Sequence, residues 1–217
     1  FFYISTFEKT IIKNYKSFLL DSGAFTYLNQ KKKTQVNWEN YVNEYADFIN
    51  EYKIDLFFEL DIDPIVGLAN VEKLRLQLEQ KTGKKSIPVW HKSRGLDYWE
   101  WMVKNYDYVA IGGLVTREIK PKEYPIFHKL LKIARENNCK VHGLGFTNVK
   151  GMNKYAFDSV DSTSWLSGNR FGMIFLFKNA KMSKHIKKAG QRVKTIETAR
   201  HNFKHWVAFS KYAEQHL

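Results

Sequence analysis

Short apolar runs of strand length recur along this 217-residue chain, and segments with helical spacing of apolar residues stand between them. The runs are Phe1 to Ser5, Phe18 to Asp21, Asp55 to Asp61, Ile87 to His91, Tyr108 to Gly113, Lys140 to Gly145, Phe157 to Asp161 and Met173 to Phe177. Apolar strands that alternate with helices are typical of a parallel sheet covered on both faces. Eight such units predict an α/β fold of the (β/α)8 TIM-type barrel class, and a doubly wound sheet is the alternative.

The segments between the runs have the spacing of apolar residues that is typical of helices. Tyr41, Tyr45 and Phe48 are spaced to share one face of a helix. Helices are expected at Trp38 to Tyr52, Leu68 to Gln80, Leu96 to Asn105, Glu123 to Asn137 and Thr195 to His216. Because no Pro- or Ser-rich linker divides the chain, we predict one domain over residues 1–217 that ends in a basic helical tail over residues 178–217.

The charge of the chain indicates an anionic partner. The sequence has 35 Lys and Arg against 22 Asp and Glu, a net charge of +13. An excess of this size attracts polyanions, so nucleic acid is expected, and a lysine-rich surface that binds nothing in particular is the alternative. The residues predicted to contact phosphates are Lys31, Lys32, Arg170, Lys184, Lys187, Lys188 and Arg192.

Other features of the composition exclude classes of protein. The single Cys139 rules out an internal disulfide and a zinc site built from several cysteines. No run of 18 apolar residues and no signal-peptide pattern is present, which predicts a soluble protein of the cytoplasm. We expect neither a metal nor a cofactor, and the sequence leaves homo-oligomerisation open.

Polar residues or glycines follow almost every predicted strand. They are Asp21, Asp61, Asp63, His91, Gly112, Gly113, His142, Gly145 and Asp161. Active sites of (β/α)8 barrels lie at the carboxyl ends of the strands, so we expect these residues to converge on one pocket.

Two of the strands deliver an aspartate beside hydroxyl or glycine residues. Asp21 ends one apolar run, and Asp161 lies in the sequence Phe-Asp-Ser-Val-Asp-Ser-Thr-Ser-Trp that begins at Phe157. An unpaired carboxylate near a core is costly, which favours a pocket with two carboxylates facing one substrate. An aspartate that only shapes its turn is the structural alternative for both.

Four motifs, in order along residues 18–177, resemble the tRNA-guanine transglycosylase family. Asp21-Ser22-Gly23-Ala24-Phe25 is similar to its DSGGF motif, and Ile111-Gly112-Gly113-Leu114-Val115 to its GGL(A/S)V motif. His142-Gly143-Leu144-Gly145-Phe146 resembles HLMGVG, and Phe157-Asp158-Ser159-Val160 falls where the family has FDCV. The Pro-Val-Trp-His strand and the Ser-Val-Asp-Ser-Thr-Ser-Trp signature are closer to the small zinc-free phage and bacterial branch that inserts 7-deazaguanines into DNA.

The resemblance implies a base-exchange enzyme, a pentosyltransferase of a bacterial or phage-infected cell. Guanine in a nucleic acid would be replaced by a 7-deazaguanine, with cyano or aminomethyl substitution, through a covalent aspartyl-sugar intermediate. Asp161 is then the nucleophile and Asp21 the second acid or base. Asp158, which aligns directly with the aspartate of FDCV, is the alternative nucleophile, since residues three apart on a strand face opposite sides.

The resemblance also implies the residues that hold the substrate. Asp61 would accept hydrogen bonds from the guanine N1 and 2-amino groups, with Asp63 as the substitute, and the backbone of Gly112 and Gly113 would approach the purine carbonyl. The other predicted contacts are Ser22, Gly23, Phe25, His91, Leu114, His142, Gly145 and Trp165. Aromatic residues commonly stack on a flipped base, but plain packing is the alternative for Phe25 and Trp165, as is a core position for both histidines.

The chain departs from the tRNA enzymes at one point. Their zinc site of three cysteines and a histidine is absent, and with it a subdomain that helps to hold tRNA, which favours DNA over tRNA as the partner. Two other interpretations stay open. One is a metal-dependent hydrolase with Asp21, Asp61, His91, His142 and Asp161 as ligands. The other is a barrel that binds nucleic acid without catalysis.

Overall fold

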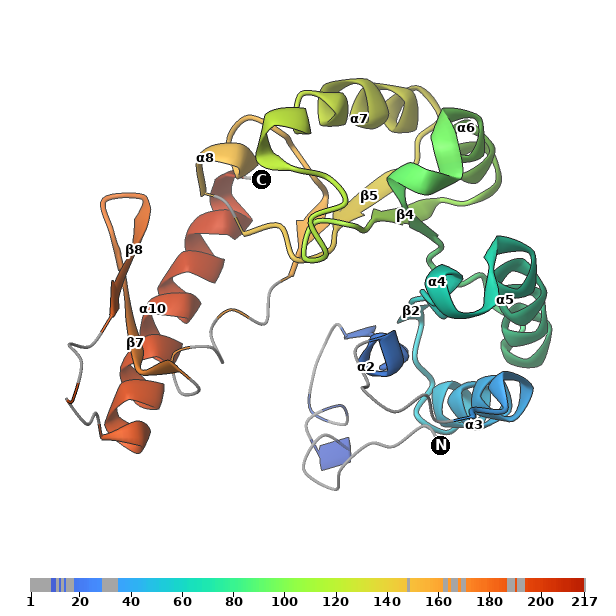
Figure 1. Ribbon diagram of the computed structural model, residues 1–217, viewed down its shortest axis with the longest axis horizontal. Helices are drawn as coiled ribbons and strands as arrows, with labels where there is room; N and C mark the ends of the chain where they lie inside the picture. Colours follow the sequence, from blue (N-terminus) through green and yellow to red (C-terminus); the bar gives the residue numbers. More distant parts are fainter. Residues whose placement is uncertain are drawn as a thin grey trace. The chain divides into compact units, whose positions relative to one another are not determined.

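A computed structural model describes residues 9, 10, 12, 14, 18–28, 35–147, 149–161, 164, 168, 171–186, 190 and 194–216 (Figure 1). The chain divides into two compact units, Phe1–Ala110 and Ile111–Leu217, called unit 1 and unit 2 below. The boundary falls within strand β4 (Tyr108–Ile111). The predicted strand Phe1 to Ser5 lies outside the described residues.

Unit 1 repeats a strand-helix pattern. Its strands are β1 (Leu19–Leu20), β2 (Leu56–Phe57), β3 (Val89–Trp90) and most of β4. Its helices are α2 (Phe25–Leu28), α3 (Trp38–Glu51), α4 (Asp63–Val66), α5 (Leu68–Thr82) and α6 (Gly95–Asn105), with a 3-10 turn η1 (Lys92–Arg94). β1 pairs in parallel with β2, and a parallel bridge joins Phe58 to Ile87 ahead of β3.

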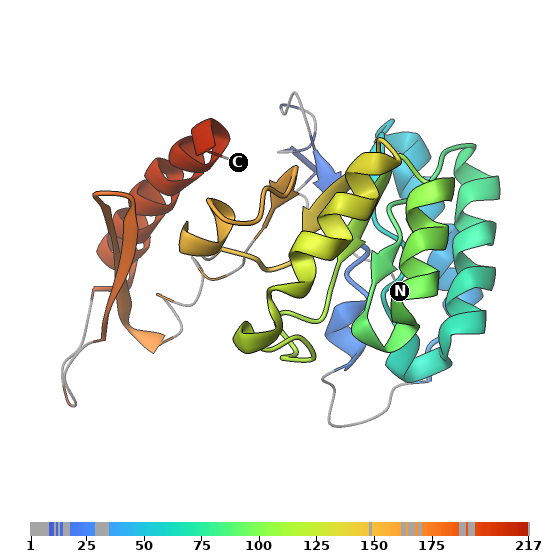
Figure 2. The ribbon, with the colours of Figure 1, turned by 90° about the horizontal axis from the view of Figure 1, so that it is seen from above.

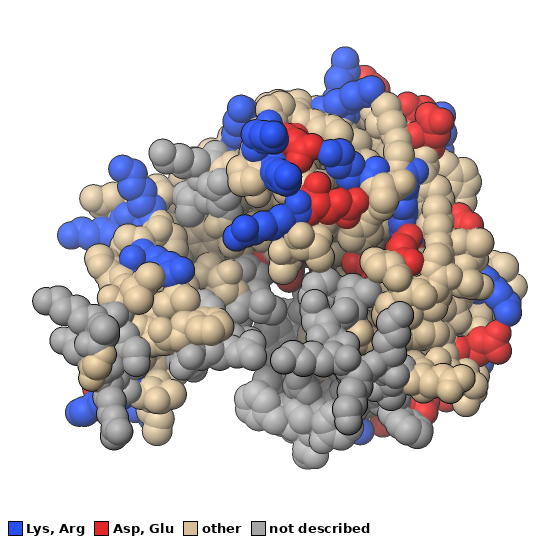
Figure 3. Space-filling view, viewed as in Figure 1, with Lys and Arg blue, Asp and Glu red and all other residues tan. Residues whose placement is uncertain are grey.

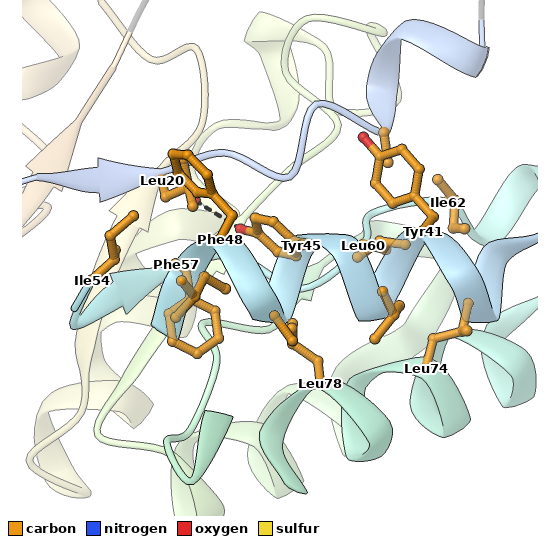
Figure 4. Close-up of a cluster of buried hydrophobic side chains, with 14 of the residues drawn as sticks. Leu20, Tyr41, Tyr45, Phe48, Ile54, Phe57, Leu60, Ile62, Leu74 and Leu78 are labelled. Atoms are coloured by element: carbon orange, nitrogen blue, oxygen red, sulfur yellow. Dashed lines mark hydrogen bonds between the residues drawn. The ribbon is translucent and has the colours of Figure 1, made fainter. Parts of the chain in front are cut away.

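The core of unit 1 forms where α3 and α5 pack side by side against the strands (Figure 4). Asn37 begins α3 by accepting a hydrogen bond from the backbone N–H of Asn40, at 3.0 Å, through its side chain. Tyr45 is fully buried, and its hydroxyl lies 3.2 Å from the carbonyl of Leu20 and 3.1 Å from that of Phe58. The helix is thereby fixed against the ends of two neighbouring strands.

Unit 2 combines parallel strands with a hairpin. Its elements are η2 (Pro121–Glu123), α7 (Ile126–Glu136), β5 (Lys140–Gly143), α8 (Val149–Met152), β6 (Ser159–Val160), β7 (Met173–Lys178), β8 (Lys181–Ile186) and α10 (Thr195–His216). β5 and β6 are parallel, with His142 opposite Ser159 and Gly143 opposite Val160. The core of this unit contains three buried aromatic rings that contact one another, those of Phe127, Phe146 and Phe157.

The last predicted strand belongs to an antiparallel hairpin. β7 pairs with β8 from Met173 opposite Ile186 to Lys178 opposite Lys181, so residues 181–186 of the predicted helical tail are a strand. The two turn residues, Asn179 and Ala180, have φ of 51° and 54°, the conformation that tight hairpin turns require. α10 lies along β7 (Figure 2) and confirms the predicted helix Thr195 to His216.

Side chains of α10 form hydrogen bonds with the backbone of β7, as a neighbouring strand would do. Asn202 is buried, accepts from the N–H of Phe175 at 2.8 Å and donates to the carbonyl of Met173 at 2.9 Å. His205 Nδ1 accepts from the N–H of Phe177 at 3.1 Å. These side chains bond backbone groups of β7 that do not pair with β8. The hairpin and α10 therefore form one packed element.

The described strands form sheets of two, four and two strands, and the four-stranded sheet has the order β3-β4-β5-β6. The positions of strands β1 to β7 and of α3, α5, α6 and α7 agree with the periodicity of the sequence, whereas that of β8 does not. Closure into an eight-stranded barrel stays a prediction. Among the described residues, no helix has both the length and the apolar character that crossing a bilayer requires.

Candidate active site

Asp161 stands directly after β6, at the carboxyl end of that strand, as its predicted role demands. Its Oδ1 accepts a hydrogen bond from the backbone N–H of Gly145 at 2.7 Å and lies 3.3 Å from Nε2 of His142. Half of the side chain, 50%, is exposed. The carboxylate is therefore both held by the protein and accessible.

Asp161 is also kept in its charged form. Partial burial acts to raise the pKa of Asp161, but the hydrogen bonds from His142 and Gly145 outweigh it and leave that pKa below its ordinary value. An aspartate of lowered pKa is ionised at neutral pH, the state that a carboxylate nucleophile needs.

Asp158 is fixed at the opposite end of the same strand. Its backbone N–H donates to the carbonyl of Val141 at 3.0 Å, and its Oδ2 accepts from the N–H of Val141 at 2.7 Å. This double contact pairs Asp158 with the start of β5, at the amino end of the parallel pair. Of the two candidate nucleophiles, only Asp161 lies where parallel strands present catalytic groups.

His142 has the buried position that was the alternative to substrate contact. Only 1% of the residue is exposed, and its ring lies between Ser159 Oγ, 2.5 Å from Nδ1, and Asp161, on the Nε2 side. Direct contact of His142 with a substrate stays a prediction. In the described structure the ring reaches this site through its contact with Asp161.

The two glycine motifs of unit 2 meet beside this aspartate. Gly145 has φ of 72°, and a Cβ placed on it would lie 2.5 Å from Cγ2 of Val115. Gly113 has φ of 79°, and a Cβ there would lie 2.8 Å from Glu118 Oε2. Both positions therefore require glycine. Gly112 is buried and Leu114 half-buried in the same loop, and Leu144 N–H donates to the carbonyl of Ile111 at 3.1 Å.

A cavity of about 530 Å³ adjoins Asp161. One side consists of Thr147 and residues 158–161, and the other of an aromatic and small-residue face of α10. The lining residues from α10 are Phe203, Trp206, Val207, Phe209, Ser210, Ala213 and Glu214. Sequence reasoning missed this face, although the helical spacing of Phe203, Trp206 and Ser210 was the available signal.

In unit 1, Asp21 forms the turn that was its structural alternative. Its Oδ1 accepts from the N–H of Gly23 at 3.3 Å, Gly23 has φ of 70°, and the aspartate is exposed. Ser22 is buried, and its carbonyl accepts from the hydroxyl of Tyr41 at 2.7 Å. Ser22 therefore supports the loop through its backbone. The side chain of Phe25 lies outside the described part of the structure.

Unit 1 also contains a buried charge cluster that sequence reasoning missed. Glu59 has no exposed surface, and it accepts from the N–H of Val89 at 2.8 Å, Arg94 Nη1 at 3.0 Å and Arg75 Nη1 at 2.9 Å. Arg94 in turn holds both oxygens of Asp63, at 2.9 and 2.6 Å. The sequence signal for this cluster was that Glu59, Asp61 and Asp63 are spaced two residues apart, because alternate residues of a strand share a face.

The cluster is stabilised by mutual compensation of its charges. Burial raises the pKa of Glu59, while Arg94 and Arg75 act in the opposite direction. Burial also disfavours the charge on each arginine, but the Glu59 carboxylate, together with Tyr98 and Tyr106 for Arg75 and with Asp63 and Tyr98 for Arg94, raises the pKa of both. Three hydrogen-bond donors, two of them cationic, surround a carboxylate that can only accept, so we assign the ionised form to Glu59.

Asp61 and His91 form a second pair, distinct from the contacts of Glu59 with the two arginines. His91 Nε2 lies 2.6 Å from Asp61 Oδ1, and the two side chains are 13% and 20% exposed. Since Arg94 occupies both oxygens of Asp63, Asp61 is the better placed of the two to accept hydrogen bonds from a ligand. His91 contacts Asp61, and this contact orients the carboxylate.

Three groups in this region can hold a metal ion. Ligand atoms of Asp61, Asp63 and His91 all lie within 4.8 Å of one another in the described structure. A hard divalent cation prefers carboxylate oxygens, which two of them supply. The bidentate Arg94 opposes such an ion, because its positive charge lies on the same carboxylate of Asp63.

Of the predicted phosphate contacts, the described structure contains Lys184, which is exposed on β8. Figure 3 shows Lys and Arg side chains with few acidic neighbours over the hairpin. Outside the described residues lie Lys31, Lys32, Trp165, Arg170, Lys187, Lys188 and Arg192.

The described structure thus gathers the predicted residues into two clusters. Unit 1 brings Asp61, Asp63 and His91 together, and unit 2 brings together His142, Asp161 and the loops that carry the glycines. No protein-family model matches the chain, and no curated protein matches it at a significant level.

Proposed function

We propose that this protein is a nucleic-acid guanine transglycosylase that exchanges guanine, in DNA, for a 7-deazaguanine base. The observation that carries the proposal is the state of Asp161: a half-exposed carboxylate at a strand's carboxyl end, with a lowered pKa and two hydrogen bonds. Those are the properties of a carboxylate that attacks rather than one that only pairs.

The proposed reaction has two halves. In the first, an oxygen of Asp161 forms a bond to the sugar C1′ as the C1′–N9 bond breaks, and guanine leaves with the bonding electron pair and takes a proton from a second acid. In the second, the 7-deazaguanine gives its N9 proton to the same group and attacks C1′, and the bond to Asp161 breaks. The proton is returned, so the exchange needs no oxidant, reductant or cofactor.

Roles for the other residues follow from the resemblance. Asp21 is the second acid or base, and its exposed carboxylate is compatible with proton transfer. Asp61, oriented by His91, recognises the guanine edge. The backbone of Gly112 and Gly113, with Leu114 and Gly145, contacts the purine.

The distribution of charge supports a nucleic-acid partner. Residues 178–217 contain ten Lys and Arg against two Asp and Glu, so most of the excess charge of the chain lies in this tail. Exposed basic residues there include Lys178, Lys181 and Lys184 on the hairpin and Arg200 and Lys204 on α10. We propose that they contact the phosphate backbone of DNA, with tRNA as the alternative.

The experiment that tests this function is covalent trapping. The protein is incubated with a guanine-containing DNA oligonucleotide, with tRNA, or with a guanine-free oligonucleotide, and adducts are detected on denaturing gels and by intact mass. We expect an adduct with guanine-containing DNA, its loss in Asp161→Ala, and its retention in the matched control Asp158→Asn. An adduct that survives in Asp161→Ala but not in the Asp158 variant would reverse the assignment, and no adduct with any nucleic acid would reject the function.

A second function is favoured by one observation, the Asp61, Asp63 and His91 cluster. It would make the protein a metal-dependent hydrolase in which the ion activates water. Metal analysis of the purified protein separates the two. A stoichiometric divalent ion whose removal by a chelator abolishes activity would support the hydrolase, whereas exchange that is indifferent to chelator supports the transglycosylase.

A further inference from the structure

The hydrogens around His142 can be assigned from its neighbours. Its Nε2 faces Oδ1 of Asp161, and an ionised carboxylate can only accept a hydrogen bond. Nε2 therefore carries a hydrogen. In a neutral imidazole the other nitrogen, Nδ1, then has none and must accept.

Ser159 is the donor that this arrangement requires. Its Oγ lies 2.5 Å from Nδ1 of His142, and the two residues are directly opposite in the parallel register of β5 and β6. A hydroxyl can give or accept a hydrogen bond, so it donates to Nδ1 when the ring is neutral. With a neutral ring the order of donation is Ser159 to His142 to Asp161.

The contacts of Asp161 with His142 and with the backbone of Gly145 involve the same carboxylate oxygen. The Gly145 N–H and His142 Nε2 converge on Oδ1. An attack through Oδ2 would leave both in place while the carboxylate changes from a charged group to an ester.

We propose that Ser159 and His142 are positioning residues, a hydrogen-bonded relay that fixes the direction in which Asp161 presents its other oxygen, Oδ2. The inference rests on the proposed transglycosylase for its consequence in catalysis, but the relay itself is a property of the unliganded protein. Groups that hold and orient a reacting residue commonly change activity by 10- to 100-fold when they are removed, by analogy with the residues that orient metal ligands.

The relay is tested first without any nucleic acid. Nitrogen-15 NMR of the histidine rings, assigned with a His142→Gln variant, should show a hydrogen on Nε2 of His142 and none on Nδ1. Carbon-13 NMR should follow the titration of the Asp161 carboxyl. We expect the pKa of Asp161 to rise in His142→Leu and to rise less in His142→Gln, because glutamine supplies an N–H donor and a carbonyl acceptor.

Exchange kinetics supply the second readout. We expect His142→Leu to lower kcat by about 10- to 100-fold with KM for DNA within about twofold of the unmodified protein, because the relay does not touch the substrate. Ser159→Ala should have a smaller effect in the same direction, and His142→Gln should recover part of the loss. The control is His128→Gln, a histidine exposed on α7, which should change neither readout.

The outcomes separate the relay from the function. Hydrogen on Nδ1 instead of Nε2, or an Asp161 titration that is the same in all His142 variants, would overturn the relay. Should His142→Leu fail to fold, His142→Gln and Ser159→Ala still decide by the same NMR signals. If the unmodified protein exchanges no base although its NMR signals are as expected, the proposed function fails and the relay stands.

Discussion

The two clusters of titratable residues differ in how their carboxylates are compensated. In unit 1, Glu59 is fully buried between two arginines, and both oxygens of Asp63 are held by one of them. In unit 2, Asp161 is half exposed and is held by a backbone amide and a histidine. A carboxylate locked to guanidinium groups is needed by the structure, because its removal leaves buried charges uncompensated, whereas one held at a single oxygen by weaker donors keeps its charge available for reaction.

The comparison predicts opposite outcomes for stability and activity. The largest effect is expected from Asp161→Asn, which removes the attacking charge and should lower exchange by at least about 1,000-fold. The same change should alter the free energy of unfolding by less than about 1 kcal/mol, because the side chain is half exposed. Exchange assays and urea unfolding measure the two quantities. A variant that remained active would break the distinction between the clusters.

Glu59→Gln should show the reverse. It leaves the buried side chains of Arg75 and Arg94 without their shared counter-charge, so the free energy of unfolding should fall by about 3–5 kcal/mol. Glu136→Gln, at an exposed position on α7 that pairs loosely with Lys132 at 3.9 Å, is the control and should cost less than about 0.5 kcal/mol. Equal effects of the two changes in urea unfolding would show that burial of Glu59 does not matter.

A smaller loss is expected from Arg94→Lys. Lysine keeps the charge but cannot reproduce the fork that reaches both oxygens of Asp63 and Glu59 together. The free energy of unfolding should fall by about 1–3 kcal/mol. If the metal-dependent alternative holds, the loosened Asp63 should bind a divalent ion more tightly, which calorimetric titration with Mg²⁺ or Mn²⁺ would detect.

The smallest effect concerns the dependence of stability on pH. The pKa of Asp161 is lower in the folded protein than in the unfolded chain, where it is about 3.9. Its contribution is therefore complete above about pH 4 to 5 and is lost as the pH falls through the folded value. Unfolding curves recorded from pH 7 down to pH 3 should converge for the unmodified protein and Asp161→Asn only at the acid end. Convergence already at pH 6 would assign the effect to a histidine.

Local periodicity placed most of the elements correctly. Tyr41, Tyr45 and Phe48 predict α3, and Thr195 to His216 has the same bounds in the sequence and in α10. These predictions succeed because the spacing of apolar residues reflects which face of an element is buried, and this spacing is written in neighbouring residues. The hairpin was missed because its lysine-rich second strand, Lys181–Ile186, depends on pairing with β7 and on the turn at Asn179 and Ala180.

Residue chemistry at strand ends determined which candidates to consider: Asp21, Asp61, Asp63, His91, His142, Asp158 and Asp161 are all visible in the sequence. Only the tertiary structure showed that Asp161 and Asp158 have different hydrogen-bond partners, and that Asp63 pairs with Arg94 while Asp61 does not. It also showed that His142 is buried and that Glu59 lies between two arginines. The reason is physical. A carboxylate's role depends on which donors and how much water surround it, and those neighbours come from other strands that the linear order does not bring together.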